Sequence, residues 1–143
     1  MKISQISVFL ENRKGRLYEV CALLGQGEIN IRALNIAETT DFGILRMVVD
    51  QPEAALKLLR AHGFVASVTD IVAVQVDDRP GGLAEVLRVL SQSDTNVEYM
   101  YAFVEKRTDK ALVVFRFDDL DKAIRVLTEH GLTIVKKAEL VGL

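Results

Sequence analysis

An internal repeat constrains the fold more than any other feature of this sequence, because the second half of the chain returns the pattern of the first. Asn12-Arg13-Lys14-Gly15-Arg16-Leu17 returns 66 residues later as Asp78-Arg79-Pro80-Gly81-Gly82-Leu83. From Asp50 onward the offset is 68, so that His62-Gly63 matches His130-Gly131. The two extra residues fall near residues 107–110, in a predicted hairpin, where insertions are tolerated. The repeat therefore predicts two copies of one unit, residues 1–69 and residues 70–143.

Each copy shows the same order of elements. Residues 3–10 alternate apolar and polar side chains as a half-buried strand does, whereas Leu17, Val20, Cys21 and Leu24 have helical spacing. The predicted strands are residues 3–10, 29–39, 44–49 and 64–68 in the first copy and residues 71–76, 96–104, 111–117 and 133–140 in the second. The predicted helices are residues 17–24 and 51–62, then 82–91 and 119–130.

The ends of the second helix in each copy carry recognisable signals. Asp50 and Asp118 are expected to cap these helices, and Gly63 and Gly131 are expected to end them. The element order is then βαββαβ, twice, which favours an antiparallel sheet with both helices on one face. The sequence thus predicts an α+β protein of two ferredoxin-like units, joined without a linker rich in Pro, Gly or Ser.

Composition excludes several classes of function. The net charge is −2 and no basic run is present, so the electrostatic attraction that dominates nucleic-acid affinity is missing. RNA-recognition domains share the βαββαβ order, but the basic glycine-aromatic motif that they need is absent from residues 44–49 and 111–117. The single cysteine, Cys21, excludes an internal disulfide and paired-cysteine metal motifs, and we expect it in the core. The first ten residues resemble neither a signal peptide nor a membrane span, which favours a cytoplasmic protein.

The turn after the first strand of each copy carries the chemistry. A glycine at position 15 or 81 lets a ligand approach the backbone closely, and the helix that follows presents amide groups suited to a carboxylate. Asn12 or Asp78 supplies an oxygen acceptor suited to an ammonium group. A carboxylate seat beside an ammonium acceptor is a receptor for the shared part of an α-amino acid. The ligand's side chain would then meet aliphatic walls, namely Leu17, Ile31, Leu83 and Val97.

Simpler roles are open for the same residues. Asn12 and Asp78 could be helix caps, a role that can coexist with ligand binding. Arg13 and Arg79 are either solvated loop charges, partners of the acidic residue two positions earlier, or ligand contacts. Three aromatic residues on one strand face, at positions 99, 101 and 103, suit a core, a subunit interface or a ligand wall. An acylphosphatase-like enzyme is a further alternative, weakly suggested by Arg13 and Asn30, but no nucleophile with a paired base accompanies them.

These motifs resemble the ACT domain, once per copy and over nearly the whole chain. The resemblance lies in the Asn/Asp-Arg-Lys/Pro-Gly-Arg/Gly-Leu turn, the amphipathic helix after it, and the Asn30-Ile31 or Asn96-Val97 start of the next strand. It implies a regulatory module that holds an amino acid at an interface between two ACT units, with the Asn-Ile and Asn-Val pairs facing the turns across that interface. The first copy departs from the pattern at Lys14 and Arg16, so its site is expected to be weaker or differently selective.

The sequence and the resemblance together predict a non-catalytic module that binds a small amino acid and signals by altering assembly or partner contacts. The alternative is an interaction module that works without a ligand. Expected partners are a second copy of the chain or a metabolic enzyme, with no nucleic acid, membrane, metal or cofactor. The candidate ligand-binding residues are Asn12, Arg13, Gly15, Leu17, Asn30, Ile31, Asp78, Arg79, Gly81, Gly82, Leu83, Asn96 and Val97.

Overall fold

The structure is a computed structural model, and it describes residues 2–38, 41–103 and 109–141. The chain divides into two compact units, one of residues 4–69 and one of residues 2–3 and 70–141. Both units combine an antiparallel sheet with helices. The predicted α+β class, with two ferredoxin-like βαββαβ units, is confirmed.

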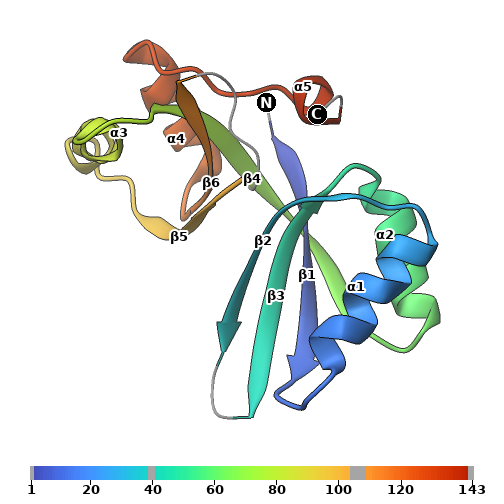
Figure 1. Cartoon of the computed structure of the whole chain (residues 1–143). Helices are drawn as coiled ribbons and strands as arrows, with labels where there is room; N and C mark the ends of the chain where they lie inside the picture. Colours follow the sequence, from blue (N-terminus) through green and yellow to red (C-terminus); the bar gives the residue numbers. More distant parts are fainter. Residues whose placement is uncertain (1, 39–40, 104–108, 142–143) are drawn as a thin grey trace. The chain divides into compact units, whose positions relative to one another are not determined.

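The first unit contains three complete strands, two helices and the beginning of a fourth strand. Its elements are β1 (Ile3–Glu11), α1 (Arg16–Gln26), β2 (Ile31–Glu38), β3 (Phe42–Val49), α2 (Pro52–Ala61) and the first part of β4 (Val65–Asp77). The strands hydrogen-bond in the order β2-β3-β1-β4. Figure 1 shows α1 and α2 side by side on one face of this sheet, as the βαββαβ order predicts.

The second unit repeats this plan from the remainder of β4. Its other elements are α3 (Gly82–Ser91), β5 (Val97–Ala102), β6 (Lys110–Phe117), α4 (Leu120–Glu129) and α5 (Lys137–Val141), with the strand order β4-β6-β5. The pairing registers match between the units, because Glu11 lies opposite Phe42 and Asp77 lies opposite Lys110. The two predicted strands at residues 64–68 and 71–76 form one continuous strand, β4, so the copies share an element.

One predicted strand is wrong for most of its length. Residues 133–140 were expected to form the last strand of the second unit, but only an isolated bridge between Val74 and Ile134 forms, and α5 follows. The charged run at residues 136–139, Lys-Lys-Ala-Glu, lacks apolar alternation and consists of good helix formers, which explains the helix. Two further predicted strands end at Thr39 and Val104, which lie outside the described residues, as does Arg107 in the predicted insertion.

Each unit has its own apolar core between its sheet and its helices. In the first unit, Val8, Leu45 and Leu59 are fully buried, and in the second Phe115, Phe117 and Leu127 are. Cys21 is only partly buried on α1, and this burial raises the pKa of its thiol, which favours the unreactive protonated form. Tyr101 and Phe103 are buried.

The second helix of each unit ends as the sequence predicts. His62 and His130 are the C-cap residues of α2 and α4, and each Nδ1 donates to the carbonyl oxygen four residues earlier, at 3.0 and 2.9 Å. Gly63 and Gly131 follow with φ of +83° and +74°. Glycine adopts this left-handed conformation without strain, so it ends both helices.

The expected caps at Asp50 and Asp118 are wrong. The N-cap residues of α2 and α4 are Gln51 and Asp119, and of these only Asp119 caps with its side chain, accepting from the Lys122 amide at 3.1 Å. Asp50 and Asp118 bind the start of the second strand instead. Their Oδ1 atoms accept from the amides of Asn30 and Asn96 at 2.9 and 3.1 Å, and their own amides donate back to the carbonyl oxygens of those asparagines.

Replacing Asp118 with alanine should therefore lower the free energy of unfolding by about 1–2 kcal/mol, because the Asn96 amide loses its charged acceptor. Chemical denaturation measures this change. Lys57→Ala, on an exposed position of α2, is the control and should change stability by less than about 0.5 kcal/mol. Equal stabilities for the two variants would contradict the assigned role of Asp118.

Candidate functional site

The turn before the first helix has the same backbone geometry in both units. Gly15 precedes α1 with φ 91° and ψ −12°, and Gly81 precedes α3 with φ 85° and ψ −8°. Both are N-cap residues in the left-handed conformation, which explains why glycine stands at these positions. A glycine has no side chain with which to cap a helix. The N-cap residues are therefore Gly15 and Gly81, and Asn12 and Asp78 do not occupy the N-cap positions.

The helix starts at Gly15 and Gly81 present backbone donors in the first turn. The Arg16 amide donates to the Arg13 carbonyl at 3.2 Å and the Glu19 amide to the Gly15 carbonyl at 3.0 Å. The amides of Leu17 and Tyr18 lie between them, in the first turn, where a helix offers no intrahelical acceptor. The second unit repeats the arrangement from Gly82 to Glu85. Each turn therefore presents amide groups that suit an anion.

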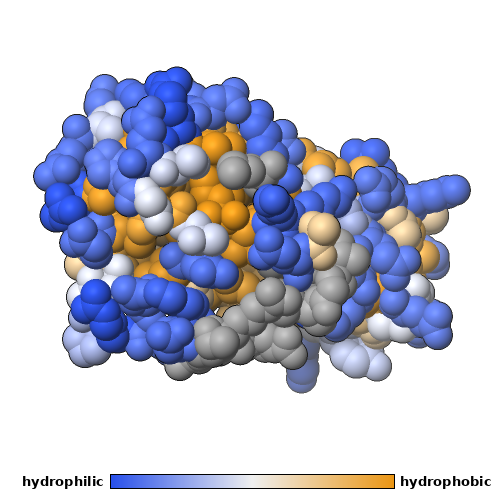
Figure 2. All heavy atoms as spheres, turned by 90° about the horizontal axis from the view of Figure 1, so that it is seen from above, coloured by the Kyte–Doolittle hydropathy of each residue, from blue (hydrophilic) through white to orange (hydrophobic). Residues whose placement is uncertain are grey.

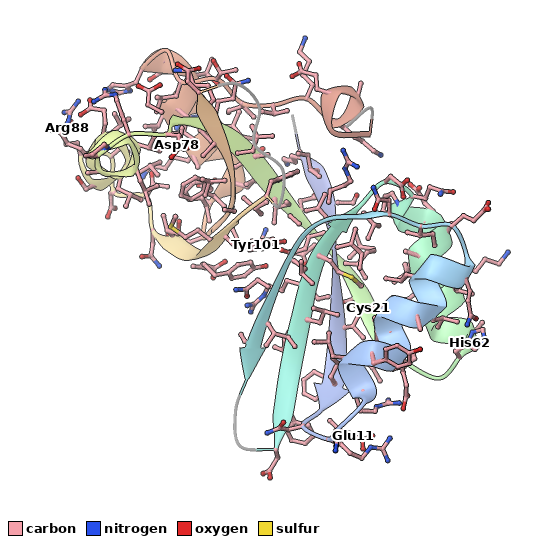
Figure 3. The ribbon with its side chains drawn as sticks, in the orientation of Figure 1. Glu11, Cys21, His62, Asp78, Arg88 and Tyr101 are labelled. Carbon is pink, nitrogen blue, oxygen red and sulfur yellow. The ribbon has the colours of Figure 1, made fainter. Side chains whose placement is uncertain are left out.

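Hydrogen bonds hold each turn against the neighbouring hairpin. The Asn12 amide donates to the Asp41 carbonyl at 2.9 Å, and the Asp78 amide donates to the Asp109 carbonyl at 3.0 Å. Figure 3 shows Glu11 at the end of β1, where the first turn begins, and Asp78 at the matching turn before α3. The backbone position of both candidate ammonium acceptors is thus fixed by the fold.

The arginines of the turns lie beside the acidic residue two positions earlier. Arg13 Nε is 4.0 Å from Glu11 Oε2, and Arg79 Nη2 is 3.4 Å from Asp77 Oδ2. Asp77 also pairs with Lys110 at the start of β6. The hydrogen bond and charge of Lys110 hold the pKa of the Asp77 carboxyl below its usual range, and Asp77 raises the pKa of Lys110.

In the first unit, a small pocket of about 80 Å³ opens beside the turn. Leu17 and Ile36 form its apolar side, and both side chains remain about two-fifths exposed. The lining residues are Leu10, Glu11, Asn12, Arg16, Leu17, Ile36 and Gly43.

The second unit has a larger pocket, of about 250 Å³, on the other side of its turn. It brings together carboxylates from Asp77 and Glu85, the ammonium of Lys110, and Gly82. The lining residues are Gln75, Asp77, Gly82, Glu85, Val86, Lys110, Gly131, Leu132 and Thr133.

A third hollow, of about 360 Å³, is more open to solvent and lies along α1. Arg16 and Phe64 form part of its wall, and the turn residues before Arg16 do not line it.

Figure 2 shows, on one face of the molecule, apolar residues exposed within a frame of hydrophilic ones.

Four predicted site residues lie away from the turns of their own unit. Ile31 is the first residue of β2 and pairs with Val49. The Asn12 turn lies next to the other end of β2, which is 8 residues long. At about 3.3 Å per residue, roughly 25 Å separates these ends. Asn96 and Val97 have the matching position in the second unit, where Val97 pairs with Phe117. Contact of these four residues with a ligand, through a neighbouring ACT unit, stays a prediction.

The Asp77–Lys110 pair gives a pH-dependent prediction. The pKa of Asp77 is lowered in the folded protein. The ion pair therefore stabilises the fold fully at pH values above the pKa of aspartate in the unfolded chain. This stabilisation is lost as the pH falls through the lowered pKa of the folded state. Lys110→Met should return the pKa of Asp77 toward its ordinary value, as measured by NMR titration. Arg88 is the main cause of the lowered pKa of Glu85. This pKa is therefore the internal control and should stay unchanged. An unchanged Asp77 pKa in this variant would contradict the pairing.

Comparison with known proteins identifies the fold family. A family model described as an ACT domain pair matches residues 1–143. The chain belongs to this ACT domain pair family. The resemblance inferred from the repeated turns is thereby confirmed.

Three solved structures illustrate what this ACT pair is similar to. A protein from Bacteroides thetaiotaomicron has 41% identity and a TM-score of 0.93, over 100% of this chain and 98% of that one. The ligand-free regulatory subunit of aspartate kinase from Thermus thermophilus has 17% identity and a TM-score of 0.63, over 88% and 91%. A structure of aspartokinase alpha and beta subunits has 15% identity and a TM-score of 0.59, over 88% and 90%. The last two show that the fold is shared, and no curated protein matches the chain.

Two negative findings apply to residues 2–38, 41–103 and 109–141 of the ACT pair. In these ranges no three His, Cys, Asp or Glu side chains are placed so that they could hold a metal ion. None of the helices there is both long and apolar enough to cross a membrane.

Several pocket residues of the ACT pair were missed by the sequence reasoning. Lys110, Glu85 and Gln75 line the pocket of the second unit, yet none stood among the candidates. The repeat carried the necessary signal, because an offset of 68 aligns Lys110 with Phe42 and an offset of 66 aligns Gln75 with Phe9. A change from aromatic to polar residues at two repeat-related positions marks a local difference between the two units.

Proposed function

We propose that this ACT pair is a non-catalytic regulator that binds a small α-amino acid beside a glycine turn. The observation that carries the proposal is the repeated turn geometry. Gly15 and Gly81 both begin a helix in the left-handed conformation, and each helix has a pocket beside its start. A glycine at this position lets a ligand approach the backbone without a Cβ in the way.

The ligand's two charged groups match the chemistry of the turn. Its carboxylate accepts from first-turn amides, such as those of Leu17 or Leu83, where the helix dipole also favours negative charge. Its ammonium group lies near the side-chain oxygen of Asn12 or Asp78. Binding of this kind needs no cofactor, and it recognises the part that all α-amino acids share.

Regulation depends on the side of the site that is open to solvent. The first-unit pocket, of about 80 Å³, needs a second wall for the ligand's side chain, which another ACT unit packed on the turn would supply. A ligand that fits only the closed arrangement shifts the protein toward it by its difference in affinity. The partner would be a second copy or a metabolic enzyme in the cytoplasm, and the fold shared with a regulatory subunit of aspartate kinase supports this.

A thermal-shift screen of the twenty amino acids tests the proposal. A ligand of about ten heavy atoms can reach micromolar affinity. At about one hundred times its Kd it would add roughly 2.7 kcal/mol to the free energy of unfolding, which raises the Tm by roughly 5–10 °C. D-enantiomers of the active compounds are the control. A flat response to all twenty would contradict amino-acid binding.

One observation favours a second candidate, a ligand-independent interaction module. Phe9 and Phe42 form a ring pair at 5.1 Å between centroids and are 47% and 46% exposed. Leu34 and Ile36 on β2 are also exposed. Such apolar side chains suit a protein contact. Sedimentation of wild type and Phe42→Ser would show a change in assembly state if this surface joins two copies, and identical sedimentation would contradict that use.

A further inference from the structure

The second unit's pocket has a counterpart in the first unit, the hollow of about 360 Å³ along α1, where the chain supplies its own cation. Gly82 in the second unit corresponds to Arg16 in the first, Glu85 to Glu19, and Leu132 to Phe64. The guanidinium carbon of Arg16 lies 4.6 Å from the centre of the Phe64 ring, and Arg16 Nη1 is 2.6 Å from Glu19 Oε2. The Arg16 side chain is only 19% exposed. The guanidinium group of Arg16 thus lies between the carboxylate of Glu19 and the apolar ring of Phe64.

In the second unit this place is open. Gly82 has no side chain to fill it, and none could be added, because a Cβ there would lie 1.9 Å from the Asp77 carbonyl oxygen. The carboxylate and the apolar wall remain, as Glu85 and Leu132, and they line the pocket of about 250 Å³. The surroundings that hold a guanidinium in the first unit are therefore available to a ligand's cationic group in the second.

The opposite side of the pocket also differs between the units. Phe9 and Phe42 make the exposed ring pair of the first unit, whereas Gln75 and Lys110 occupy the corresponding positions in the second and line its pocket. The Lys110 ammonium has three donors, so it can hold Asp77 and an incoming carboxylate together. Glu85 binds Arg88 Nη2 and Nε at 2.6 and 3.2 Å, and its oxygens keep further lone pairs for an ammonium group.

We propose that the second unit alone provides the amino-acid site, with the ligand's cationic group at Glu85 and its carboxylate between Lys110 and the first turn of α3. In the first unit Arg16 already occupies the place beside Glu19 and Phe64, so one ligand binds per chain. This inference rests on the proposed function and narrows it to one unit. It also moves the contact of the ligand's cationic group from Asp78 to Glu85 and adds Lys110 as a contact of the carboxylate.

Isothermal titration calorimetry tests the inference with each amino acid that stabilises the protein in the thermal screen. Wild type should bind one ligand per chain. Glu85→Gln removes the charged acceptor and Lys110→Met the charged donor, and each should weaken binding by at least about tenfold. Glu19→Gln, at the repeat-related position of the first unit, is the matched control and should bind like wild type. Thermal unfolding of each variant without ligand verifies that it is folded.

The outcomes separate this inference from the proposed function. If no amino acid binds wild type, the proposed function fails and the inference fails with it. If a ligand binds but the stoichiometry is two, or Glu19→Gln weakens binding as much as Glu85→Gln does, amino-acid sensing stands and the restriction to the second unit is overturned. Retained affinity in folded Glu85→Gln and Lys110→Met together would overturn the assigned contacts.

Discussion

Replacing Phe117 with alanine is expected to lower the free energy of unfolding by about 3–5 kcal/mol, the largest effect we predict for a single substitution. Phe117 is the last residue of β6, has no exposed surface and packs within the core of the second unit. Its ring stacks on Phe115 with 5.5 Å between centroids and 9° between planes. Alanine would leave a cavity that the surrounding strand and helix side chains can fill only in part.

Chemical denaturation of Phe117→Ala measures this effect, and Phe42→Ala is the matched control. Phe42 is also a strand phenylalanine, but it is 46% exposed, so its loss should cost about 1 kcal/mol or less. A Phe117 variant as stable as the Phe42 variant would show that the assigned core of the second unit is wrong.

Gly82→Ala should lower the free energy of unfolding by about 2–4 kcal/mol, although only a methyl group is added. The new Cβ would lie 1.9 Å from the Asp77 carbonyl oxygen and 2.9 Å from the carbonyl carbon. Both are backbone atoms, so no side chain can rotate to make room. Either the turn or the start of α3 must shift, and the hydrogen bond from the Arg79 amide to the same carbonyl would be strained.

Gly25→Ala is the control for this substitution. Gly25 lies within α1, and a Cβ there would meet nothing within 4 Å. Alanine is a better helix former than glycine, so this variant should be as stable as wild type or more stable by up to about 1 kcal/mol. If Gly82→Ala and Gly25→Ala changed stability equally, the close approach at Asp77 would be contradicted.

Residue patterns alone predicted most of the fold because the repeat provided two independent readings of each element. Helical spacing around Val20, strand alternation from Ile3 and the stop at Gly63 all agree with the structure. Errors arose where a local signal had two possible uses. Asp50 looked like a helix cap, but its carboxylate binds the Asn30 amide, and a partner 20 positions away is not visible in a local pattern.

The candidate site was predictable only in part. The glycines of the turns stood out because both copies keep them, and the structure gives them the positive φ that explains their presence. Lys110 was missed because only the pairing of β6 with β4 brings it to the turn, whereas Glu85 lies in the first turn of α3, where a single sequence does not show that it lines a pocket. The pairing of Asp77 with Lys110 depends on the register of β4 and β6, which a single sequence does not fix residue by residue.

Amide chemical shifts of the glycines, recorded while an amino acid from the thermal screen is titrated into labelled protein, test the central claim most directly. At saturation, the amide resonance of Gly81 or Gly15 should move, whereas those of Gly25 and Gly63 should stay in place. Gly63 is a strong control because it has a positive φ like the turn glycines but ends a helix instead of starting one. A ligand that binds and leaves both turn glycines unmoved would contradict the claim that these turns hold the amino acid.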